Sequence, residues 1–242
     1  WEQRLRRGGY RITPQREVQR VTDETNRSRW TIIDDSRLRL ADDLDIAPDG
    51  KIYFSASSAY FGQELWSTDL TTQNTQQVVD IYPGAPSGMR TDVAHNMVVY
   101  NDRLYFSARN LTSGFELWST DGTSAGTGIV ADLTTANSGT QAQYYNGPTN
   151  LTVCNGKLFF SGYSNQGYEL HVSDGTSAGT TMVKNIQVYD SSNPSYLVCM
   201  NNVLYFAADD SYYWQSNSGT FGNELWRSDG TSAGTYRIDD IN

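Results

Sequence analysis

The sequence predicts an all-β protein made of repeated four-stranded units, and three observations support this prediction. The phrase Gly-x-Glu-Leu-x-x-Ser/Thr-Asp occurs four times in the 242 residues. Its glutamates are separated by 52, 53 and 55 residues, a period typical of repeat architectures; they are Glu64, Glu116, Glu169 and Glu224. The chain is rich in Tyr, Gly, Ser, Thr, Asn and Asp, and each repeat holds four short segments of strand-like alternation. Four antiparallel strands per repeat of about 50 residues make the blade of a β-propeller, which is the predicted fold class.

The N-terminal part predicts an incomplete unit. Residues 8–13 and 17–21 alternate apolar and polar side chains around a Pro-Gln-Arg turn, as a half-buried hairpin does. Residues 22–40 are charged and irregular. We interpret residues 1–43 as a partial blade and a connector.

Each later repeat supplies four strands. In the first full unit they cover residues 44–47, 51–56, 64–67 and 77–81. The corresponding segments of the next three units are 97–100, 103–108, 116–119 and 129–133; 151–154, 157–162, 169–173 and 182–186; and 197–200, 203–207, 224–227 and 236–241.

These units predict one domain of four full blades, at residues 44–92, 93–149, 150–196 and 197–242, plus the N-terminal hairpin. The hairpin and the last strand do not complement each other. We therefore expect additional blades, or a partner chain, to close a larger ring.

The Ser/Thr-Asp-Gly-Thr segments predict tight turns between the third and fourth strands. Asp oxygens accept hydrogen bonds from nearby backbone amides, and Gly tolerates a positive φ. In the first full unit Leu70 and Asn74 replace the two glycines. Leu is unfavourable in the left-handed region, so we expect a different turn at residues 68–75.

The repeated glutamates are predicted to be structural. Each precedes an aromatic side chain by two positions, namely Trp66, Trp118, His171 or Trp226. Catalysis needs groups that converge, whereas these carboxyl groups belong to separate blades, so we expect each one to hold a neighbouring turn or blade. His171 is interpreted as a substituted packing residue.

The two cysteines are Cys154 and Cys199, which follow similar segments in neighbouring repeats. Matching inner positions on adjacent repeats are usually too far apart for a disulfide. We favour two buried free thiols over a disulfide, and neither outcome alone fixes the redox compartment.

The net charge of −9 argues against sequence-independent nucleic-acid binding, which depends on neutralising phosphates. Residues 1–40 carry a local excess of Arg, which we interpret as scattered surface charge. No apolar run approaches the roughly 18 residues of a membrane span.

The full phrase Gly-x-Glu-Leu-Trp-x-Ser-Asp-Gly-Thr-x-x-Gly-Thr resembles a tandem repeat of large bacterial secreted and surface proteins. The resemblance covers residues 44–242. It implies a propeller and an extracellular, cell-surface or periplasmic location, and it implies no particular activity.

A second resemblance concerns residues 39–55, which look like a segment of the strictosidine-synthase-like and gluconolactonase-like propellers. It implies a Ca²⁺ site at the channel mouth, with Asp42 and Asp43 in the matching positions. This sequence departs from the pattern at Asp42, where the family has Asn, and at Ala56, where it has Asp. Carboxylate oxygens at Asp42 still suit calcium.

The candidate ligand-binding residues lie in long loops that we expect on one face of the propeller. The connection between the second and third strands is longest in the last unit and contains Tyr212, Tyr213 and Trp214. Other loops add Tyr82, Tyr144, Tyr145 and Tyr189. Such aromatic and amide-rich loops suit stacking on sugars or contact with another protein, although they could also merely cover blade edges.

Three functions stay open. The favoured one is a non-catalytic binding or scaffold propeller of an exported bacterial protein, which contacts a glycan or protein through the aromatic loops. The alternative is a calcium-dependent hydrolase or strictosidine-synthase-like enzyme centred on Asp42 and Asp43. The third is a structural spacer. No catalytic residues are predicted, because the sequence shows no nucleophile arrangement, phosphate loop or zinc spacing.

Overall fold

The computed structural model describes residues 20–22, 28–30, 44–46, 49–57, 61–71, 73–89, 97–133, 147–210 and 223–239. Every regular element in these ranges is a β-strand. The same ranges contain no helix with the length and apolar character needed to cross a membrane. The predicted all-β class is confirmed.

Sixteen of the strands form four antiparallel sheets, one for each predicted blade. The first blade contains β3 (Leu44–Ile46), β4 (Ile52–Ser57), β5 (Gln63–Thr68) and β6 (Gln76–Val79). The second contains β7 (Met97–Tyr100), β8 (Arg103–Ala108), β9 (Glu116–Thr120) and β10 (Gly128–Ala131). The third contains β11 (Thr149–Cys154), β12 (Lys157–Ser164), β13 (Gly167–Ser173) and β14 (Thr181–Lys184). The fourth contains β15 (Ser195–Met200), β16 (Val203–Asp209), β17 (Asn223–Ser228) and β18 (Tyr236–Asp239).

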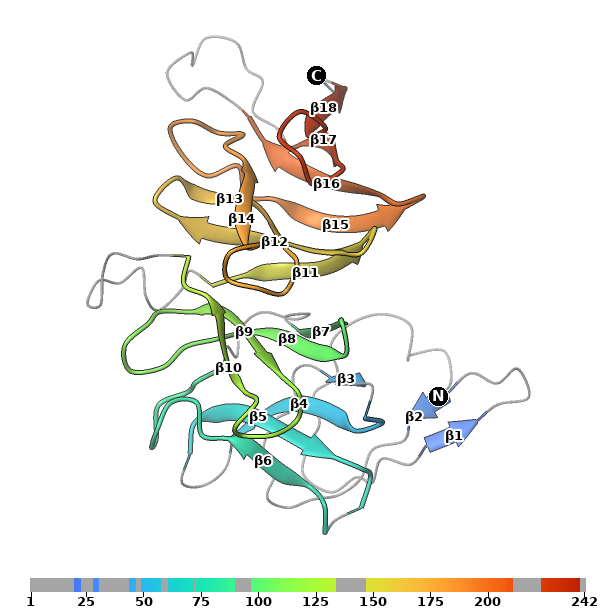
Figure 1. Ribbon diagram of the computed structural model, residues 1–242, viewed down its shortest axis with the longest axis vertical. Coiled ribbons are helices and arrows are strands. Elements are labelled where there is room, and N and C mark those ends of the chain that lie inside the picture. Colours follow the sequence, from blue (N-terminus) through green and yellow to red (C-terminus); the bar gives the residue numbers. More distant parts are fainter. Residues whose placement is uncertain are drawn as a thin grey trace.

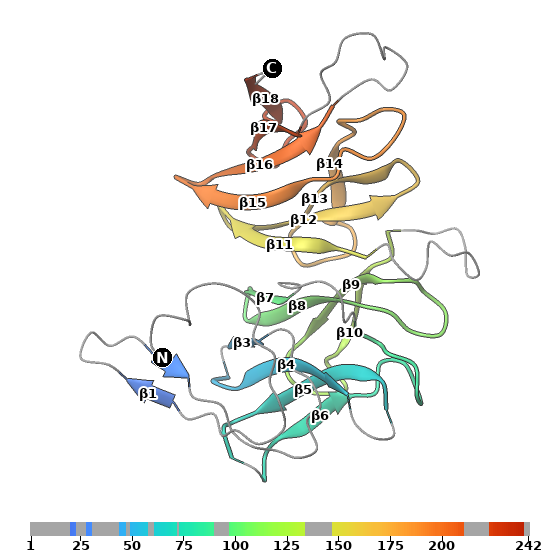
Figure 2. The ribbon, with the colours of Figure 1, turned by 180° about the vertical axis from the view of Figure 1, so that it is seen from behind.

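The blades are stacked in chain order, with the first and the fourth at opposite ends of the stack (Figures 1 and 2). Their first strands are neighbours, so that β3 lies beside β7, β7 beside β11 and β11 beside β15. This arrangement of four-stranded antiparallel sheets is that of consecutive propeller blades.

The N-terminal pairing differs from the predicted one. β1 (Arg20–Thr22) pairs antiparallel with β2 (Ser28–Trp30), so part of the segment predicted as the second hairpin strand pairs with a downstream segment. The predicted partner, residues 8–13, lies outside the described residues.

Consecutive blades pack through opposite faces of their sheets. In the first blade Tyr53, Ser67 and Leu65 share one face, which we call the Leu face. Phe54 and Trp66 are cross-strand partners on the other face, which we call the Trp face. The Leu face of each blade meets the Trp face of the next. The repeated Leu packs in a cluster with Trp118 in the first interface and with Trp226 in the third, and with Phe160 in the second, where His171 replaces the Trp.

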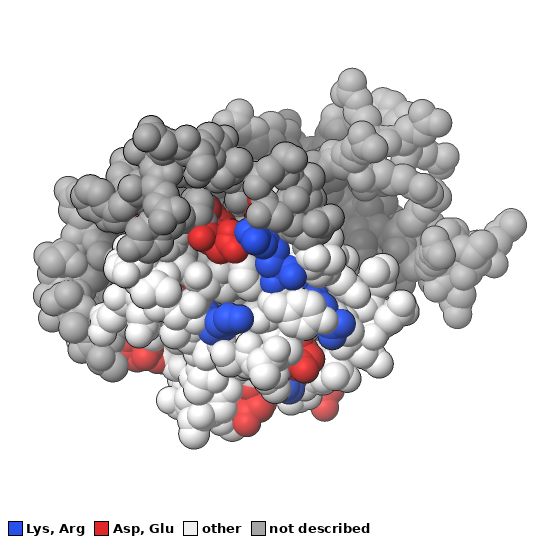
Figure 3. Space-filling view, turned by 90° about the horizontal axis from the view of Figure 1, so that it is seen from above, with Lys and Arg blue, Asp and Glu red and all other residues white. Residues whose placement is uncertain are grey.

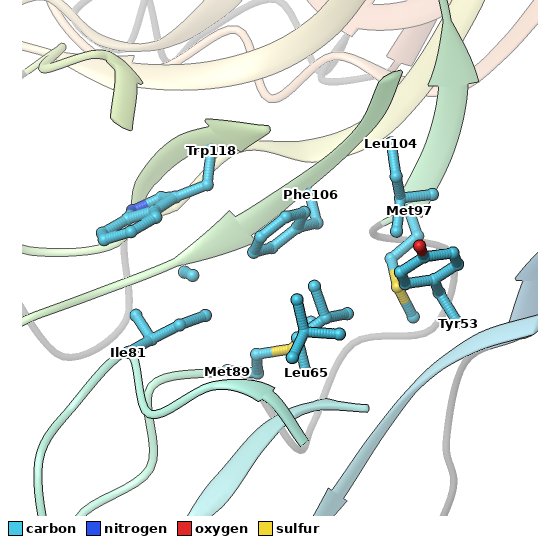
Figure 4. Packing of buried hydrophobic residues seen from close by; sticks show 10 residues of the cluster. Tyr53, Leu65, Ile81, Met89, Met97, Leu104, Phe106 and Trp118 are labelled. Atoms are coloured by element: carbon cyan, nitrogen blue, oxygen red, sulfur yellow. The ribbon is translucent and has the colours of Figure 1, made fainter. Parts of the chain in front are cut away.

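The interface between the first two blades illustrates this packing (Figure 4). Phe106 and Trp118 of the second blade join Leu65 and Ile81 of the first in one buried cluster. Leu65 and Phe106 are fully buried, and Trp118 is 7% exposed. Burial of this kind contributes about 25 cal/mol for each Å² of apolar surface removed from water, so the three interfaces carry much of the stability.

The two cysteines form a disulfide, and the prediction of two buried free thiols is wrong. Cys154 pairs with Lys157 across its hairpin, whereas in the next blade Met200 holds the matching position and Cys199 precedes it by one residue. A one-residue offset turns a side chain to the other face of its sheet. Each cysteine therefore points toward the other blade, and the Cα atoms of these neighbouring inner strands are 5.3 Å apart.

The turn at residues 68–75 is also not what the sequence predicts. Leu70 has a φ of 72°, in the same left-handed region as Gly122 at 91° and Gly175 at 95°. The Thr68 hydroxyl accepts from the Leu70 N–H, as the Thr120 hydroxyl accepts from the Gly122 N–H. The side-chain hydrogen bonds of the turn thus outweigh the unfavourable backbone angle of Leu.

Asn74 does change one contact of this turn. The second glycine is required elsewhere because a Cβ at Gly126 would overlap the Asp121 carboxylate. In the first blade the Asn74 side-chain amide donates to the carboxylate of Asp69, and its backbone N–H donates to the Thr71 carbonyl. The motif thus tolerates Asn at this position through an exchange of hydrogen bonds.

The first glycine of the turn also serves the interface between blades. A Cβ at Gly122 would overlap the Tyr53 hydroxyl of the preceding blade, and a Cβ at Gly175 would lie 2.5 Å from the Tyr105 hydroxyl. Each turn therefore closes over an aromatic residue on the Leu face of the blade before it.

Candidate binding face

The connections predicted to share one face do so in the first and third blades, where the structure describes most of them. β4 ends and β5 begins at the cross-strand pair Ser57–Gln63, and the segment after β6 folds back over this edge. The Met89 N–H donates to the Gln63 carbonyl at 2.9 Å, and the Gly62 N–H donates to the Gly84 carbonyl at 3.3 Å. We call this edge, formed by the second-to-third connections and the blade-to-blade connections, the loop face.

The repeated glutamates hold the loop face together. Glu64 is fully buried, and its carboxylate accepts hydrogen bonds from the backbone N–H groups of Ile81 at 2.9 Å and Gly88 at 2.8 Å. In the second blade Glu116 accepts from the Leu133 N–H at 2.8 Å. The predicted structural role is confirmed for both residues.

Glu169 makes the most extensive set of these contacts. It is fully buried and accepts from the N–H groups of Ile186 at 2.9 Å and Gln187 at 3.2 Å. Ser192 donates both its N–H at 3.2 Å and its hydroxyl at 2.6 Å. A carboxylate surrounded by donors in this way anchors a loop and is not available to a substrate.

These loops also connect one blade to the next. The Gly88 carbonyl accepts from the Arg109 N–H at 2.8 Å, and the Ser192 carbonyl accepts from the Asp209 N–H at 2.8 Å. Each anchored loop therefore ends at the second strand of the following blade, and the glutamate fixes the position of that strand indirectly. A rigid loop platform of this kind suits ligand binding.

Burial controls the protonation of the anchoring glutamates. It raises the pKa of Glu64 to about 7, although the N–H groups of Gly88 and Ile81 oppose this by favouring the ionised form. Burial likewise raises the pKa of Glu169 against the hydrogen bonds from Ser192 and two backbone amides. The charge of these anchoring carboxyl groups is therefore sensitive to pH.

His171 packs as the sequence predicts. It is 3% exposed, stacks on Phe160 with ring centroids 5.5 Å apart, and its Nδ1 lies 3.0 Å from the Glu169 carbonyl oxygen. Burial lowers the pKa of this imidazole. Gly162 leaves room for the ring, since a Cβ there would lie 2.8 Å from Nδ1.

An arginine contacts two aromatic rings on the loop face of the second blade. The Arg109 guanidinium carbon is 5.4 Å from the ring centroid of Tyr82 and 5.2 Å from that of Phe115. Its Nε donates to the Ser87 carbonyl at 2.9 Å. These two cation–π contacts and the hydrogen bond hold the blade-to-blade loop against the second blade.

The third blade presents the most exposed aromatic surface of the described loops. Tyr163 and Tyr168 are cross-strand partners in an edge-to-face pair with centroids 5.2 Å apart. Val188 and Tyr189 follow in the neighbouring loop, and each is 66% exposed. The Tyr168 N–H donates to the Ser191 hydroxyl at 2.9 Å, which ties this loop to the tyrosine pair. We call Tyr163, Tyr168, Val188 and Tyr189 the aromatic rim.

Of the residues predicted to bind a ligand, the structure describes Tyr82, whose ring contacts the Arg109 guanidinium, and Tyr189, which belongs to the aromatic rim. Tyr144, Tyr145, Tyr212, Tyr213 and Trp214 lie outside the described residues, as do the predicted calcium ligands Asp42 and Asp43. Within the described part of the chain, no three His, Cys, Asp or Glu side chains form a group suited to a metal ion.

The sequence reasoning missed three residues of the loop face, namely Arg109, Tyr163 and Tyr168. Tyr163 and Tyr168 are equally distant from the short turn at residues 164–167, and this symmetry could have indicated a cross-strand aromatic pair. Nothing in the local pattern around Arg109 indicates its two aromatic neighbours, which come from a loop of the first blade and from the start of β9.

Comparisons with known proteins show a likeness of fold. No protein-family model and no curated protein matches the sequence. Among solved structures, puromycin hydrolase aligns over 91% of this chain and 32% of its own, with 13% identity and a TM-score of 0.52. A mutant of puromycin hydrolase complexed with PGG aligns over 88% of this chain and 31% of its own, with 13% identity and a TM-score of 0.53.

TolB from Acinetobacter baumannii aligns over 88% of this chain and 45% of its own, with 15% identity and a TM-score of 0.47. The chain thus spans about a third of the length of puromycin hydrolase and less than half that of TolB. At these identities the likeness concerns the fold alone. The four described antiparallel sheets, packed as consecutive blades, define the protein as a β-propeller.

Proposed function

We propose that this protein is a non-catalytic binding propeller of an exported protein, and that its loop face binds a glycan. The observation that carries the proposal is the aromatic rim, where Tyr189 is 66% exposed in the loop that Ser191 joins to the Tyr163–Tyr168 pair by a hydrogen bond. The C–H faces of sugar rings stack on such aromatic surfaces.

Polar groups beside the aromatic rim favour a sugar over a purely apolar ligand. Gln166, Ser191 and Asn193 lie in the two loops that carry the rim, and they supply amide and hydroxyl groups. Sugar hydroxyls need such hydrogen-bond partners, whereas an apolar ligand would leave these amide and hydroxyl groups of the protein without hydrogen bonds.

The glutamate anchors favour binding over catalysis. Glu64 and Glu169 are fully buried, and their carboxylate oxygens accept backbone hydrogen bonds within separate blades. The most repeated acidic residues are therefore used to hold loops, which is what a rigid binding scaffold requires.

The disulfide between Cys154 and Cys199 supports the exported location. Disulfides form and persist in oxidising compartments such as the periplasm and the extracellular space, and they are rare in the reducing cytosol.

A glycan array tests the proposal directly, with the wild-type protein compared with Tyr189→Ala. Loss of one stacking ring should weaken binding by about tenfold. Tyr236→Ala is the matched control, because Tyr236 is also exposed, at 46%, and lies on β18 away from the loop face. Its binding should equal that of the wild type.

Two outcomes would contradict the proposal. If no glycan binds but a protein array yields a ligand whose binding depends on Tyr189, the ligand class is wrong and the loop face is a protein-binding site. If Tyr189→Ala binds glycan as well as the wild type does, the aromatic rim is not the site.

A further inference from the structure

The fourth blade leaves its Leu face open to solvent. Val198 and Arg227 both pair with Tyr205, and Arg227 also pairs with Tyr236, which places these residues on one side of the sheet. Five apolar side chains on this side are 40 to 55% exposed; they are Val198, Met200, Leu225, Tyr236 and Ile238. We call this surface the open face. Figure 3 views the molecule from this end; the described surface there is mostly free of charged side chains, with a short row of Lys and Arg across it and a few Asp and Glu around it.

The position of Leu225 is buried in the other blades, whereas Gln76 and Thr181, at the position of Tyr236, are exposed there as well. Leu225 is 40% exposed, whereas its counterparts Leu65, Leu117 and Leu170 are all 0% exposed. Strands β4 and β8 are buried at nearly every position, whereas β16 alternates between half-buried and buried side chains. The fourth sheet is thus covered on one face only.

In the preceding interfaces the following blade covers the Leu face of the blade before it in a recurring arrangement. Phe106 and Trp118 of the second blade join Leu65 of the first in one cluster, and Gly122 closes over the Tyr53 hydroxyl. Tyr205 holds the position of Tyr53 in the fourth blade and is half-buried. The open face therefore carries residues of the kind that a Leu face contributes to such an interface.

The apolar character of the open face is unusual for the end of a repeat array. Terminal repeats normally carry a polar outer face, because their neighbour is water. A contiguous apolar surface on a soluble protein normally marks an interaction site.

We propose that the open face is the docking surface for a further four-stranded blade of the same repeat. That blade would place its Phe and Trp against Leu225 and its glycine turn over Tyr205. All three blade–blade interfaces in the structure join blades that are consecutive in sequence. The blade expected on the open face is therefore one that a loop of the same kind joins to β18.

The first blade of a second copy is not the occupant that fits. Its Trp face would have to supply Phe54 and Trp66, and these side chains are only 3% and 8% exposed. A copy could dock in this way only by displacing what already covers them.

The experiment provides the additional blade by duplicating a part of this chain. A copy of residues 80–131, which comprises the loop after β6 and the whole second blade, is joined directly after Asp239. Its register is correct because Val79 and Asp239 occupy the same position, opposite Leu65 and Leu225. Leu225→Cys then reports burial, since the two native cysteines are bonded to each other and the copy adds none.

The rate of maleimide labelling at position 225 is compared between the extended chain and the same variant without the extension. We expect labelling to be slower by at least about tenfold in the extended monomer, because it requires local opening of the interface. Leu111→Cys, at a loop residue that is 67% exposed in the second blade, is the control and should label equally in both.

A folded extension that leaves position 225 fully reactive would overturn the proposal. So would protection of this position without any extension together with a dimeric mass in sedimentation, because the occupant would then be a second copy. If the first extension does not fold, a copy of residues 185–239 with its cysteine changed to Ser replaces it. Failure of this second blade to protect position 225 also overturns the proposal.

Discussion

Glu64→Gln tests whether burial or hydrogen bonding controls the glutamate anchors. Glu64 is fully buried and accepts N–H groups from Ile81 and Gly88. Burial favours the neutral acid, whereas the two donors favour the carboxylate, and burial prevails by raising the pKa from 4.5 to about 7. At about 1.4 kcal/mol for each pH unit, the folded state holds this proton more tightly than the unfolded chain by about 3 kcal/mol.

The sign of the effect follows from proton uptake. Between pH 4.5 and about 7 the folded state binds more protons at Glu64 than the unfolded state does. The contribution of this carboxyl group to stability is therefore fully present below pH 4.5 and is lost as the pH rises through 7. Gln at this position cannot titrate, so the free energy of unfolding of the wild type relative to Glu64→Gln should fall by about 3 kcal/mol over this range.

Urea denaturation of both proteins at several pH values between about 4.5 and 7.5 measures this difference. Other titrating groups, including Glu169 and His171, are common to both proteins and cancel when the two curves are subtracted. A difference that does not change with pH would refute the raised pKa. A difference that grows in favour of the wild type as the pH rises would show that the N–H donors prevail over burial.

Three further predictions concern the turn, the disulfide and calcium. Gly122→Ala should destabilise the protein by about 3 kcal/mol, because the added Cβ overlaps the Tyr53 hydroxyl at a positive φ. The control Gly156→Ala, which also has a positive φ but no atom within 4 Å of the added Cβ, should cost only about 1 kcal/mol, and Tyr53→Phe should partly rescue Gly122→Ala. Equal costs for both glycine variants in thermal or urea unfolding would disprove the contact between the turn and Tyr53. Replacing Cys154 and Cys199 with Ser should lower the free energy of unfolding by about 4 kcal/mol, from the entropy of closing a loop of 45 residues, and an unchanged urea midpoint would count against a bond that constrains the unfolded chain. For the calcium-dependent alternative, roughly 1 mM Ca²⁺ should raise the melting temperature relative to a chelator, and identical melting curves would remove that alternative.

Much of the fold follows from local patterns. The period of the Gly-x-Glu-Leu phrase and the alternation around pairs such as Tyr53-Phe54 predicted four blades, and β4, β8, β12 and β16 lie where expected. The structural role of Glu64 and Glu169 was also predictable, because residues that recur once in every blade cannot converge on one active site. The candidate site was predictable only in part, since Tyr82 and Tyr189 are the proposed ligand-binding residues within the described part of the chain, and Tyr163 and Tyr168 of the aromatic rim were not predicted.

The errors arose where the outcome depended on contacts between blades or on competition within a turn. The disulfide depends on a one-residue offset that points Cys154 and Cys199 toward each other, and similarity between the two local sequences concealed it. Leu70 has the backbone angle of a glycine because the hydrogen bonds from Thr68 and Asp69 outweigh its local preference.

The sequence by itself determined most strands of the four described sheets and their grouping into blades, because these depend on residues close together in the chain. Only the tertiary structure decided which face of each sheet is covered. The four repeats are nearly alike in sequence, yet Leu65, Leu117 and Leu170 are buried and Leu225 is exposed. The physical reason is that burial on a sheet face depends on a neighbouring blade, which no pattern within one blade can reveal.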